Sequence, residues 1–257
     1  MEQSRPLLEK SGVRIAAISY DSEETLRHFA DKYGIGFPLL SDAGSAVICK
    51  FGILNTNIAP GLRAHGVPHP VEYFVTGDGV VIHKYFVPNY QHRITGSGIA
   101  LREFGVVDEH APVVRLASGA VKIEVGLSSA KAFAGQEISF FTKFEIDPGW
   151  HVYGAPLPES YTTTSVTFDD SKVIRQSFTL PPAKPKEIPV LRERLFVYEG
   201  AFEAMGSLLL KFPLDSGITV LSGNVQFQQC SATKCEPPER LPFELSLTLE
   251  PFMAATH

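Results

Sequence analysis

Hydrophobic residues follow two different patterns along the chain, one before and one after residue 110. In the first half, short apolar runs alternate with stretches that have helical spacing. VRIAAIS (13–19) is a β-branched run typical of a strand covered on both faces. EETLRHFADKYG (23–34) repeats its apolar residues every three or four positions, which predicts a helix that ends at Gly34.

A second unit of the same kind follows directly. FPLL (37–40) predicts a short strand, and SDAGSAVICKFGI (41–53) predicts a capped helix. VEYFV (71–75) and VVIHKYF (80–86) flank the turn TGDG, which predicts a hairpin. The order βαβαββ indicates an α/β sheet of mixed direction.

Beyond Pro112 the pattern is that of strands throughout. Short alternating or apolar runs are separated by Gly, Pro, Ser and Asp turns, and they read AVKIEVGL, QEISFFTKFEI, SVTFDD, GSLLLKFPL, NVQFQQC and FELSLTLEP. Such spacing predicts an antiparallel β-sandwich. We place the boundary in the charged turn 105–114, so the sequence predicts an α/β domain over 1–110 and an all-β domain over 111–257.

Composition and charge exclude several functional classes. The 257 residues are 44% hydrophobic and 20% charged, which is typical of globular domains. The net charge is −5 and the basic residues are scattered, so we expect no nucleic-acid partner. Apolar runs fall short of the roughly 18 residues of a membrane helix. The first residues, MEQSRPLLEKSG, carry charges where an export signal has its apolar centre, so we expect neither a membrane span nor an export signal.

The chemistry concentrates in FQQCSATKCEPPE (227–239). An alternating strand ends at Cys230, SATK supplies turn-forming residues, and Cys235 precedes a Pro-Pro pair that forbids a helix. A four-residue turn can bring two Cα atoms within the roughly 4.4–6.8 Å that a disulfide requires. So short a loop gains little from loop-closure entropy, so the pair suits switching better than stapling. Lys234 could lower a thiol pKa through its charge, or it could be an ordinary solvated lysine.

Two other interpretations of the cysteine pair stay open. Cys-x4-Cys could supply two zinc ligands, but a structural site needs four, and the spaced pair His65 and His69 lies in the other half. We therefore expect no metal and no cofactor. The second alternative is a non-catalytic binding or scaffold module, in which the pair forms a permanent disulfide.

The first half resembles the peroxiredoxin or alkyl-hydroperoxide-reductase branch of the thioredoxin superfamily. The match rests on SGVRIAAISYDSEETLRHFADKYGIGFPLLSD (11–42) and GVPHPVEYFVTGDGVVIHKYF (66–86). It implies an incomplete thioredoxin-like fold with a cis peptide bond before Pro70. The family's reactive cysteine would precede the matched segments, and Cys49, late in its predicted helix, is expected to be buried and inert.

The missing cysteine has two explanations. We expect Met1 to be an internal start within a longer protein, and a degenerate domain kept as a scaffold is the alternative. Peroxidase activity would then belong to the longer protein and not to this chain. An incomplete sheet exposes strand edges, which makes a homodimer a further expectation.

The second half resembles the amino-terminal domain of DsbD-type thiol:disulfide interchange proteins. The match rests on DPGWHVYG (147–154), LFVYEG (195–200) and the cysteine stretch. It implies an immunoglobulin-like sandwich in which Cys235 exchanges with a partner and Cys230 resolves. Phe196 and Tyr198 correspond to aromatic residues that shield the pair.

Several further expectations accompany this resemblance. Trp150, His151 and Tyr153 are expected to buttress the sandwich, and the resemblance points to a periplasmic compartment. The implied partner is a thioredoxin-like or other thiol/disulfide protein, with electron transfer possible between the two domains. The combined prediction is thiol:disulfide exchange at Cys230 and Cys235, linked to a peroxiredoxin-type antioxidant function in the intact protein.

Overall fold

The computed structural model describes residues 1–62, 64–86, 93–188 and 192–251. The chain divides into two compact units, residues 1–96 and 97–257, which are described separately. In the described residues no helix is long and apolar enough to cross a membrane.

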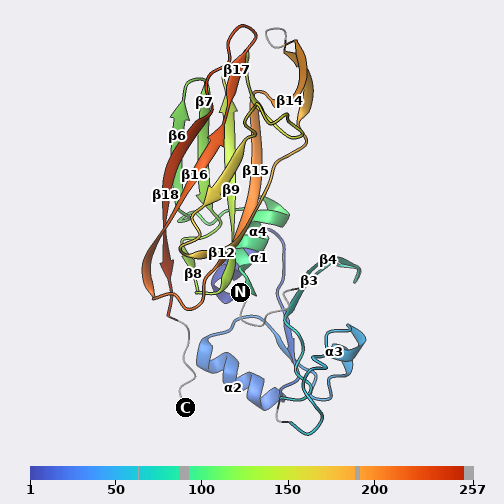
Figure 1. The fold of residues 1–257 in the computed structure, drawn as a ribbon. Coiled ribbons are helices and arrows are strands. Elements are labelled where there is room, and N and C mark those ends of the chain that lie inside the picture. Colours follow the sequence, from blue (N-terminus) through green and yellow to red (C-terminus); the bar gives the residue numbers. More distant parts are fainter. Residues whose placement is uncertain (63, 87–92, 189–191, 252–257) are drawn as a thin grey trace. The chain divides into compact units, whose positions relative to one another are not determined.

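The first unit alternates short helices and strands, as the sequence pattern predicted (Figure 1). Strands β1 and β2 pair in parallel, and β3 and β4 form an antiparallel hairpin, so the described part of this unit contains two separate two-stranded sheets. The elements are η1 (Glu2–Ser4), α1 (Arg5–Lys10), β1 (Ala17–Ser19), α2 (Glu23–Tyr33), β2 (Leu39–Ser41), α3 (Ala46–Lys50), β3 (Val71–Val75), β4 (Val81–Phe86) and β5 (Arg93–Ile94).

Helix α2 shows why the local prediction succeeded. The Ser22 side chain caps its first turn by accepting a hydrogen bond from the Thr25 N–H at 3.3 Å. Gly34 ends the helix with φ of 62°, a left-handed conformation that glycine adopts without steric cost. Both signals are local, so the sequence carries them in full.

Two predictions for the first unit are wrong. Cys49 is exposed and not buried, because Ile48 takes the inward position of the short helix α3 and its neighbours face outward. The cis bond implied at Pro70 is also absent: the described residues place their cis peptide bonds before Pro156 and Pro213. Pro70 does lie directly before β3, where an extended trans segment is the ordinary X-Pro geometry.

Helix α4 (Gly96–Phe104) starts at the boundary between the units, and the regular elements described after it are all strands. Arg102 of α4 donates to the Ser139 hydroxyl at 2.9 Å and to Glu137 at 2.7 Å, which ties the helix to β9. The strands are β6 (Val113–Ser118), β7 (Val121–Leu127), β8 (Lys131–Ala132), β9 (Gln136–Ile146), β10 (Trp150–Tyr153), β11 (Ser165–Phe168), β12 (Val173–Thr179), β13 (Lys184–Ile188), β14 (Glu193–Tyr198), β15 (Ala201–Leu210), β16 (Gly217–Phe227), β17 (Gln229–Ser231) and β18 (Glu239–Leu249). The domain limits predicted from the sequence, 1–110 and 111–257, stay a prediction.

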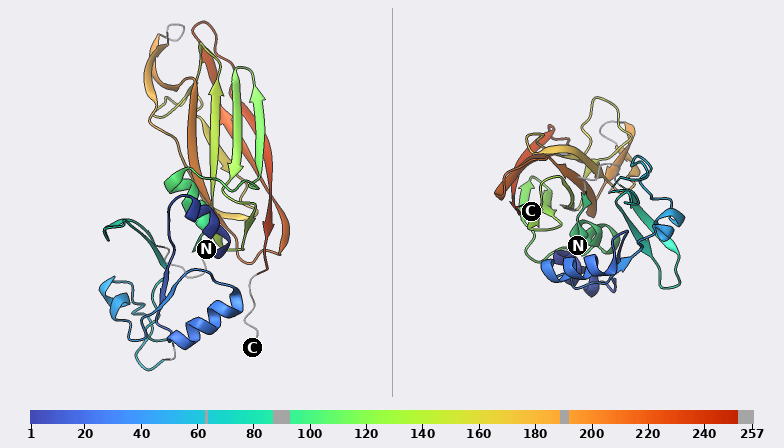
Figure 2. Two further views of the ribbon diagram at one scale, coloured as in Figure 1. Left: turned by 180° about the vertical axis from the view of Figure 1, so that it is seen from behind. Right: turned by 90° about the horizontal axis from the view of Figure 1, so that it is seen from below.

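These strands form the predicted sandwich. One layer has the order β12-β15-β9-β7-β6, and the other has the order β11-β16-β18-β8. Figure 2 shows β6, β7 and β9 side by side from behind. Strand β18 alternates perfectly, with Phe243, Leu245, Leu247 and Leu249 buried and the residues between them not buried. This period of two places one face of each strand against the other layer.

A smaller third sheet, in the order β13-β14-β10-β17, lies at one end of the sandwich (Figure 1). Its side chains form a second apolar cluster, separate from the main core between the two layers. This small sheet carries the cysteine pair, and the large layers provide its support.

Candidate functional site

Cys230 and Cys235 form a disulfide at the edge of the small sheet. Their Cα atoms are 4.1 Å apart, and the two residues also face each other across an antiparallel bridge. Cys230 lies in β17, and the Ser231 N–H donates to the Lys234 carbonyl at 2.7 Å to close the turn between them. The local bond that the sequence spacing allowed is therefore present.

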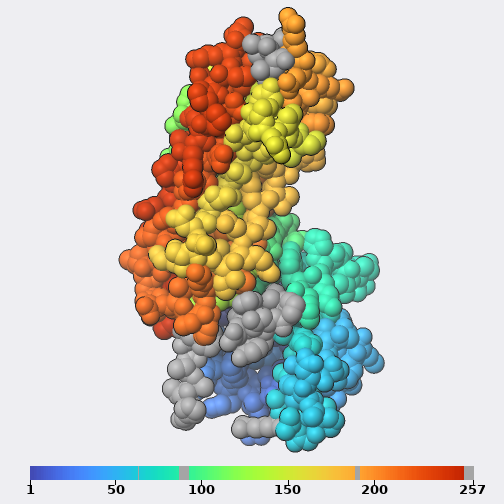
Figure 3. Space-filling model, in the orientation of Figure 1, coloured from blue at the N-terminus to red at the C-terminus, as the bar shows by residue number. Residues whose placement is uncertain are grey.

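The two sulfurs have unequal surroundings. Cys230 is fully buried, whereas Cys235 is half-buried on the return arm of the loop. The apolar cluster around them, called the disulfide pocket here, contains Tyr153, Leu157, Tyr161, Ile188, Leu195 and Val197. Figure 3 shows the segment between β10 and β11 (yellow) on the surface between the end of the sandwich that carries the cysteines (red) and β14 (orange). A reactant in solution therefore reaches the sulfur of Cys235 more easily than that of Cys230.

Tyr153 is the polar residue that touches the disulfide. Its hydroxyl donates a hydrogen bond to Cys230 Sγ at 3.0 Å and lies 3.6 Å from Cys235 Sγ. Burial, with smaller contributions from Tyr161 and Glu193, raises the pKa of Tyr153 to about 12. The phenol therefore keeps its proton at neutral pH and acts as a hydrogen-bond donor. The sequence predicted only a supporting role for this residue.

His151 lies directly across from Cys230 in the β10–β17 pairing. Its side chain is buried, and both ring nitrogens lack a hydrogen-bond partner among the described residues. Burial, and to a smaller extent the positive charge of Lys186, lowers the pKa of His151 to about 4. The neutral ring packs edge-on against Tyr153 at 5.6 Å between ring centres, which agrees with a supporting role.

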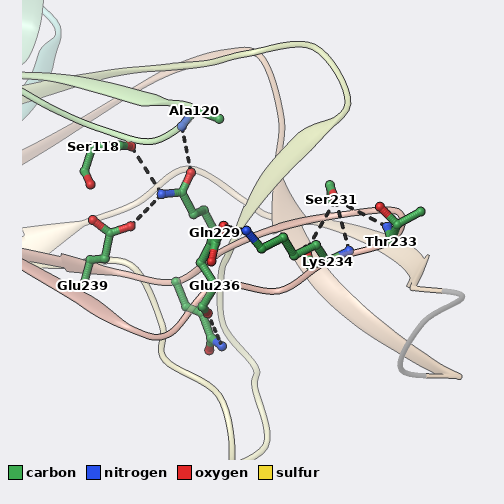
Figure 4. Close-up of polar contacts among 9 residues, drawn as sticks. Ser118, Ala120, Gln229, Ser231, Thr233, Lys234, Glu236 and Glu239 are labelled. Atoms are coloured by element: carbon green, nitrogen blue, oxygen red, sulfur yellow. Dashed lines mark hydrogen bonds and ion pairs between the residues drawn. The ribbon is translucent and has the colours of Figure 1, made fainter.

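Gln229 anchors the cysteine strand to the body of the sandwich (Figure 4). Its side-chain oxygen accepts from the Ala120 N–H at 2.9 Å. Its nitrogen donates to the Ser118 carbonyl at 3.3 Å and to the Glu239 carboxylate at 2.6 Å. A side chain at position 119, where φ is 55°, would collide with the Gln229 amide. The turn beside this amide therefore requires Gly119.

Gln228 makes the second connection from this strand. Its oxygen accepts from the Thr162 N–H at 3.1 Å, and its nitrogen donates to the Glu236 carbonyl at 3.1 Å. It thereby joins the segment before β11 to the arm that carries Cys235. The sequence stretch contained both glutamines, but adjacency to a cysteine says nothing of partners more than a hundred residues away, such as Ala120.

A groove of about 550 Å³ lies on the other side of the Cys235 arm. Trp150, which is half-buried, forms part of it. The remaining lining residues are Ser118, Gly119, Ala120, Asp147, Gln229, Glu236, Pro237 and Glu239. Trp150 therefore lines a surface groove besides packing against the main core.

In the comparisons with known proteins, the two halves of the chain match two different families. Residues 126–247 match the family model described as "Thiol:disulfide interchange protein DsbD, N-terminal", and residues 1–84 match the AhpC/TSA family. The two matches lie in different halves of the chain, and each covers less than half of its 257 residues. Both resemblances inferred from the sequence are confirmed, and so is the combination of a thioredoxin-like region with an immunoglobulin-like sandwich.

Individual relatives cover only parts of the chain. Peroxiredoxin Bcp of Escherichia coli strain K12 is 33% identical over 78 residues, which are 30% of this chain and 49% of Bcp. The putative peroxiredoxin bcp of Shigella flexneri matches to the same extent. The chain thus spans about half the length of the curated relatives it matches.

Two solved structures resemble part of this chain at low identity. The N-terminal periplasmic domain of ScsB from Proteus mirabilis is 14% identical with a TM-score of 0.42, covering 54% of this chain and 51% of ScsB. The Neisseria meningitidis DsbD n-terminal domain in the reduced form is 17% identical with a TM-score of 0.30, covering 58% of this chain and 94% of that domain.

The two aromatic residues that the resemblance assigned to shielding the pair, Phe196 and Tyr198, are not among the residues of the disulfide pocket. Tyr198 is buried in the main core, where it stacks on Phe202 with ring centres 4.4 Å apart and donates to the Pro181 carbonyl at 2.7 Å. Phe196 is half-buried and is not part of the disulfide pocket. Leu195 and Val197, one position away on the same strand, line the pocket instead. The shielding role of Phe196 and Tyr198 stays a prediction.

Lys234 has the surroundings of an ordinary solvated lysine, the simpler of the two interpretations of this residue. Its ammonium forms an ion pair with Glu236 at 2.6 Å, and about two-thirds of the side chain is exposed (64%). A charge that is both paired and solvated has little influence on a neighbouring sulfur.

Proposed function

We propose that this chain is a thiol:disulfide exchange protein that uses the Cys230–Cys235 pair. The observation that carries the proposal is the unequal burial of the two cysteines, Cys230 fully buried in an apolar pocket and Cys235 half-buried on a loop. A staple needs no such asymmetry, whereas exchange needs one sulfur that a partner can attack. The match to the DsbD amino-terminal family supports the same reaction.

The burial also suggests an order of events. A partner thiolate attacks Cys235 Sγ and forms a mixed disulfide, while Cys230 leaves as the resolving thiol. The partner is a protein with two thiols, of the thioredoxin-like kind or another dithiol protein. The resemblance gave the same order, and the partial exposure of Cys235 beside the buried Cys230 supports it.

A redox titration of the whole chain tests the exchange function. The protein is equilibrated in glutathione or dithiothreitol buffers, quenched with acid, alkylated under denaturing conditions and weighed. Cys49 has no disulfide partner and serves as an internal reference, because it adds one label in either state. Oxidised chains then carry one label and reduced chains carry three.

The expected outcome is a reversible two-electron transition between about −120 and −270 mV, the range of known exchange proteins. A pair that stays oxidised below roughly −300 mV would instead be a structural disulfide. That outcome would favour the binding or scaffold module, whose disulfide is permanent.

We further propose that the exchange pair serves a peroxiredoxin-type active site, with electrons passing from the reduced Cys230–Cys235 dithiol to the sulfenic acid or disulfide that peroxide forms there. The AhpC/TSA match supports this link. Cys49, the cysteine of this segment, lies at the end of a five-residue helix, so the chain by itself is expected not to reduce peroxide. The check is hydrogen peroxide consumption with dithiothreitol as reductant. Turnover that disappears in Cys49→Ser would contradict the expectation.

A further inference from the structure

We propose that Tyr153 is a catalytic residue of the exchange reaction, whose hydroxyl stabilises the thiolate that forms on Cys230 when a partner attacks Cys235. The inference rests on the proposed exchange function. Tyr153, which lies 77 residues before Cys230 in the sequence, donates the hydrogen bond that stabilises the negative charge on the Cys230 sulfur.

The position of the hydroxyl suits this role. It already donates to Cys230 Sγ at 3.0 Å in the oxidised state, and both residues are fully buried. Water cannot easily solvate a charge that appears on a buried sulfur, so a fixed donor has more effect there than at the surface. No large movement is needed before the donor acts.

Lys234, Lys186 and His151 do not supply this stabilisation. Thiolates in exchange proteins are commonly stabilised by a cation or by a helix N-terminus. Lys234 is paired with Glu236 and exposed, and Lys186 is paired with Glu199. His151 is neutral at physiological pH because burial lowers its pKa to about 4. In the part of the small sheet that the structure describes, strands and connecting loops offer no helix end.

The electron and proton balance of the reaction is complete with a dithiol partner. A partner thiolate forms a bond to Cys235 Sγ, the Cys230–Cys235 bond breaks, and the electron pair leaves on Cys230 Sγ, where the Tyr153 O–H donates to it. The second partner thiol then attacks the partner sulfur of the mixed disulfide and releases Cys235. The partner is oxidised to a disulfide, and the two protons it loses are matched by two taken up at Cys230 and Cys235.

Tyr153 acts by hydrogen bonding and keeps its own proton, since burial raises the pKa of the phenol to about 12. Removing the hydroxyl should therefore make Cys230 a poorer leaving group without blocking the reaction. Loss of a hydrogen bond of ordinary strength to a charged sulfur should make reduction about tenfold slower.

The test compares Tyr153→Phe with Thr142→Val in the whole chain. Thr142 is the control, because it is also fully buried and its hydroxyl donates to a backbone carbonyl, that of Ala204 in the large layer. Reduction by dithiothreitol is followed by the labelling described above. The reduced protein is also alkylated across a pH series, which reports thiolate formation at Cys230. For Tyr153→Phe we expect reduction about tenfold slower and an alkylation midpoint at higher pH, and for Thr142→Val no change in either.

A second variant separates chemistry from structural damage. Replacing Tyr153 with 3-fluorotyrosine keeps the ring and makes the hydroxyl a stronger donor, so reduction should become faster than in the native chain. Loosened packing would also speed reduction by exposing Cys230. The faster reaction therefore supports the role of Tyr153 when the variant unfolds at the same urea concentration as the native chain, and a rate that does not rise in such a variant overturns it.

The outcomes distinguish this inference from the function on which it rests. If the native pair cycles and Tyr153→Phe matches Thr142→Val in rate and alkylation profile, the role of Tyr153 is overturned and the exchange function stands. If the native pair does not cycle at all, both are overturned.

Discussion

Cys49 and the Cys230–Cys235 pair show how differently one chain can surround a sulfur. Cys49 is exposed on a five-residue helix in a unit whose described strands form two small separate sheets. Cys230 is sealed in a pocket, hydrogen-bonded by Tyr153 and attached through its neighbour Gln229 to a two-layer sandwich. The reactivity of a cysteine is controlled when the fold fixes both its exposure to solvent and its hydrogen bonds. Of these two regions, the one around Cys230 and Cys235 fixes both.

The largest effect should come from the cysteines themselves. Cys235→Ser should abolish exchange completely, because it removes the sulfur that a partner can reach. Cys49→Ser should leave the rate of disulfide reduction unchanged within error. The measurement is the rate at which the chain oxidises dithiothreitol. Equal losses in the two variants would break the contrast between the regions.

Acid should weaken the second region through His151. Its pKa is about 4 in the folded chain against about 6.5 when unfolded, so the folded state favours the neutral ring. The contribution is fully present above pH 6.5 and is lost as pH falls from there toward 4, by on the order of 3 kcal/mol. The adjacent charges of Lys186 and Glu199 oppose each other and change this little.

Urea unfolding followed by Trp150 fluorescence at pH 7 and pH 4.5 measures that loss, because Trp150 is the one tryptophan of the chain and precedes His151. His151→Phe should flatten the pH dependence, whereas His110→Asn, at an exposed histidine, should not. An unchanged slope in His151→Phe would show that other groups cause the acid sensitivity.

Gln229→Ala should destabilise the second region by about 2 kcal/mol, because it leaves the buried Ala120 N–H without a partner. Gln176→Ala is the control: that side chain also bonds backbone groups, the N–H and the carbonyl of Phe168, but it is exposed. The expected change for the control is below about 1 kcal/mol, by the same unfolding measurement. Equal changes would mean that the anchor at the cysteine strand has no special weight.

Lys234→Ala should have the smallest effect, less than about threefold on the rate of reduction, since an exposed ion pair contributes at most about 1 kcal/mol. The measurement is the same reduction assay at low and at 0.5 M salt. Suppose that Lys234→Ala is reduced tenfold more slowly and that 0.5 M salt slows the native chain by the same factor. The charge of Lys234 would then control the reactivity of the cysteine pair.

Local signals in the sequence were sufficient for much of this structure. The helix from Glu23 to Tyr33 follows from its caps and a period of three to four residues, and the hairpin after Pro70 follows from its turn. The alternating strand β18 follows from a period of two. The disulfide between Cys230 and Cys235 follows in the same way from a short turn. Each of these features depends on neighbours within a few positions, which is the range that a sequence pattern covers.

The surroundings of the sulfurs were decided by tertiary structure. Pairing of β10 with β17 places Tyr153 and His151 at the cysteine strand, and one residue of register separates the side chains that face the pocket from those that face away. For that reason Leu195 and Val197 line the pocket where Phe196 and Tyr198 were expected. The sequence by itself determined that a cysteine pair closes a loop on a β-sandwich. Only the packing of distant strands decided which sulfur is buried and which hydroxyl meets it, because strand register and face are settled by contacts between segments far apart in the chain.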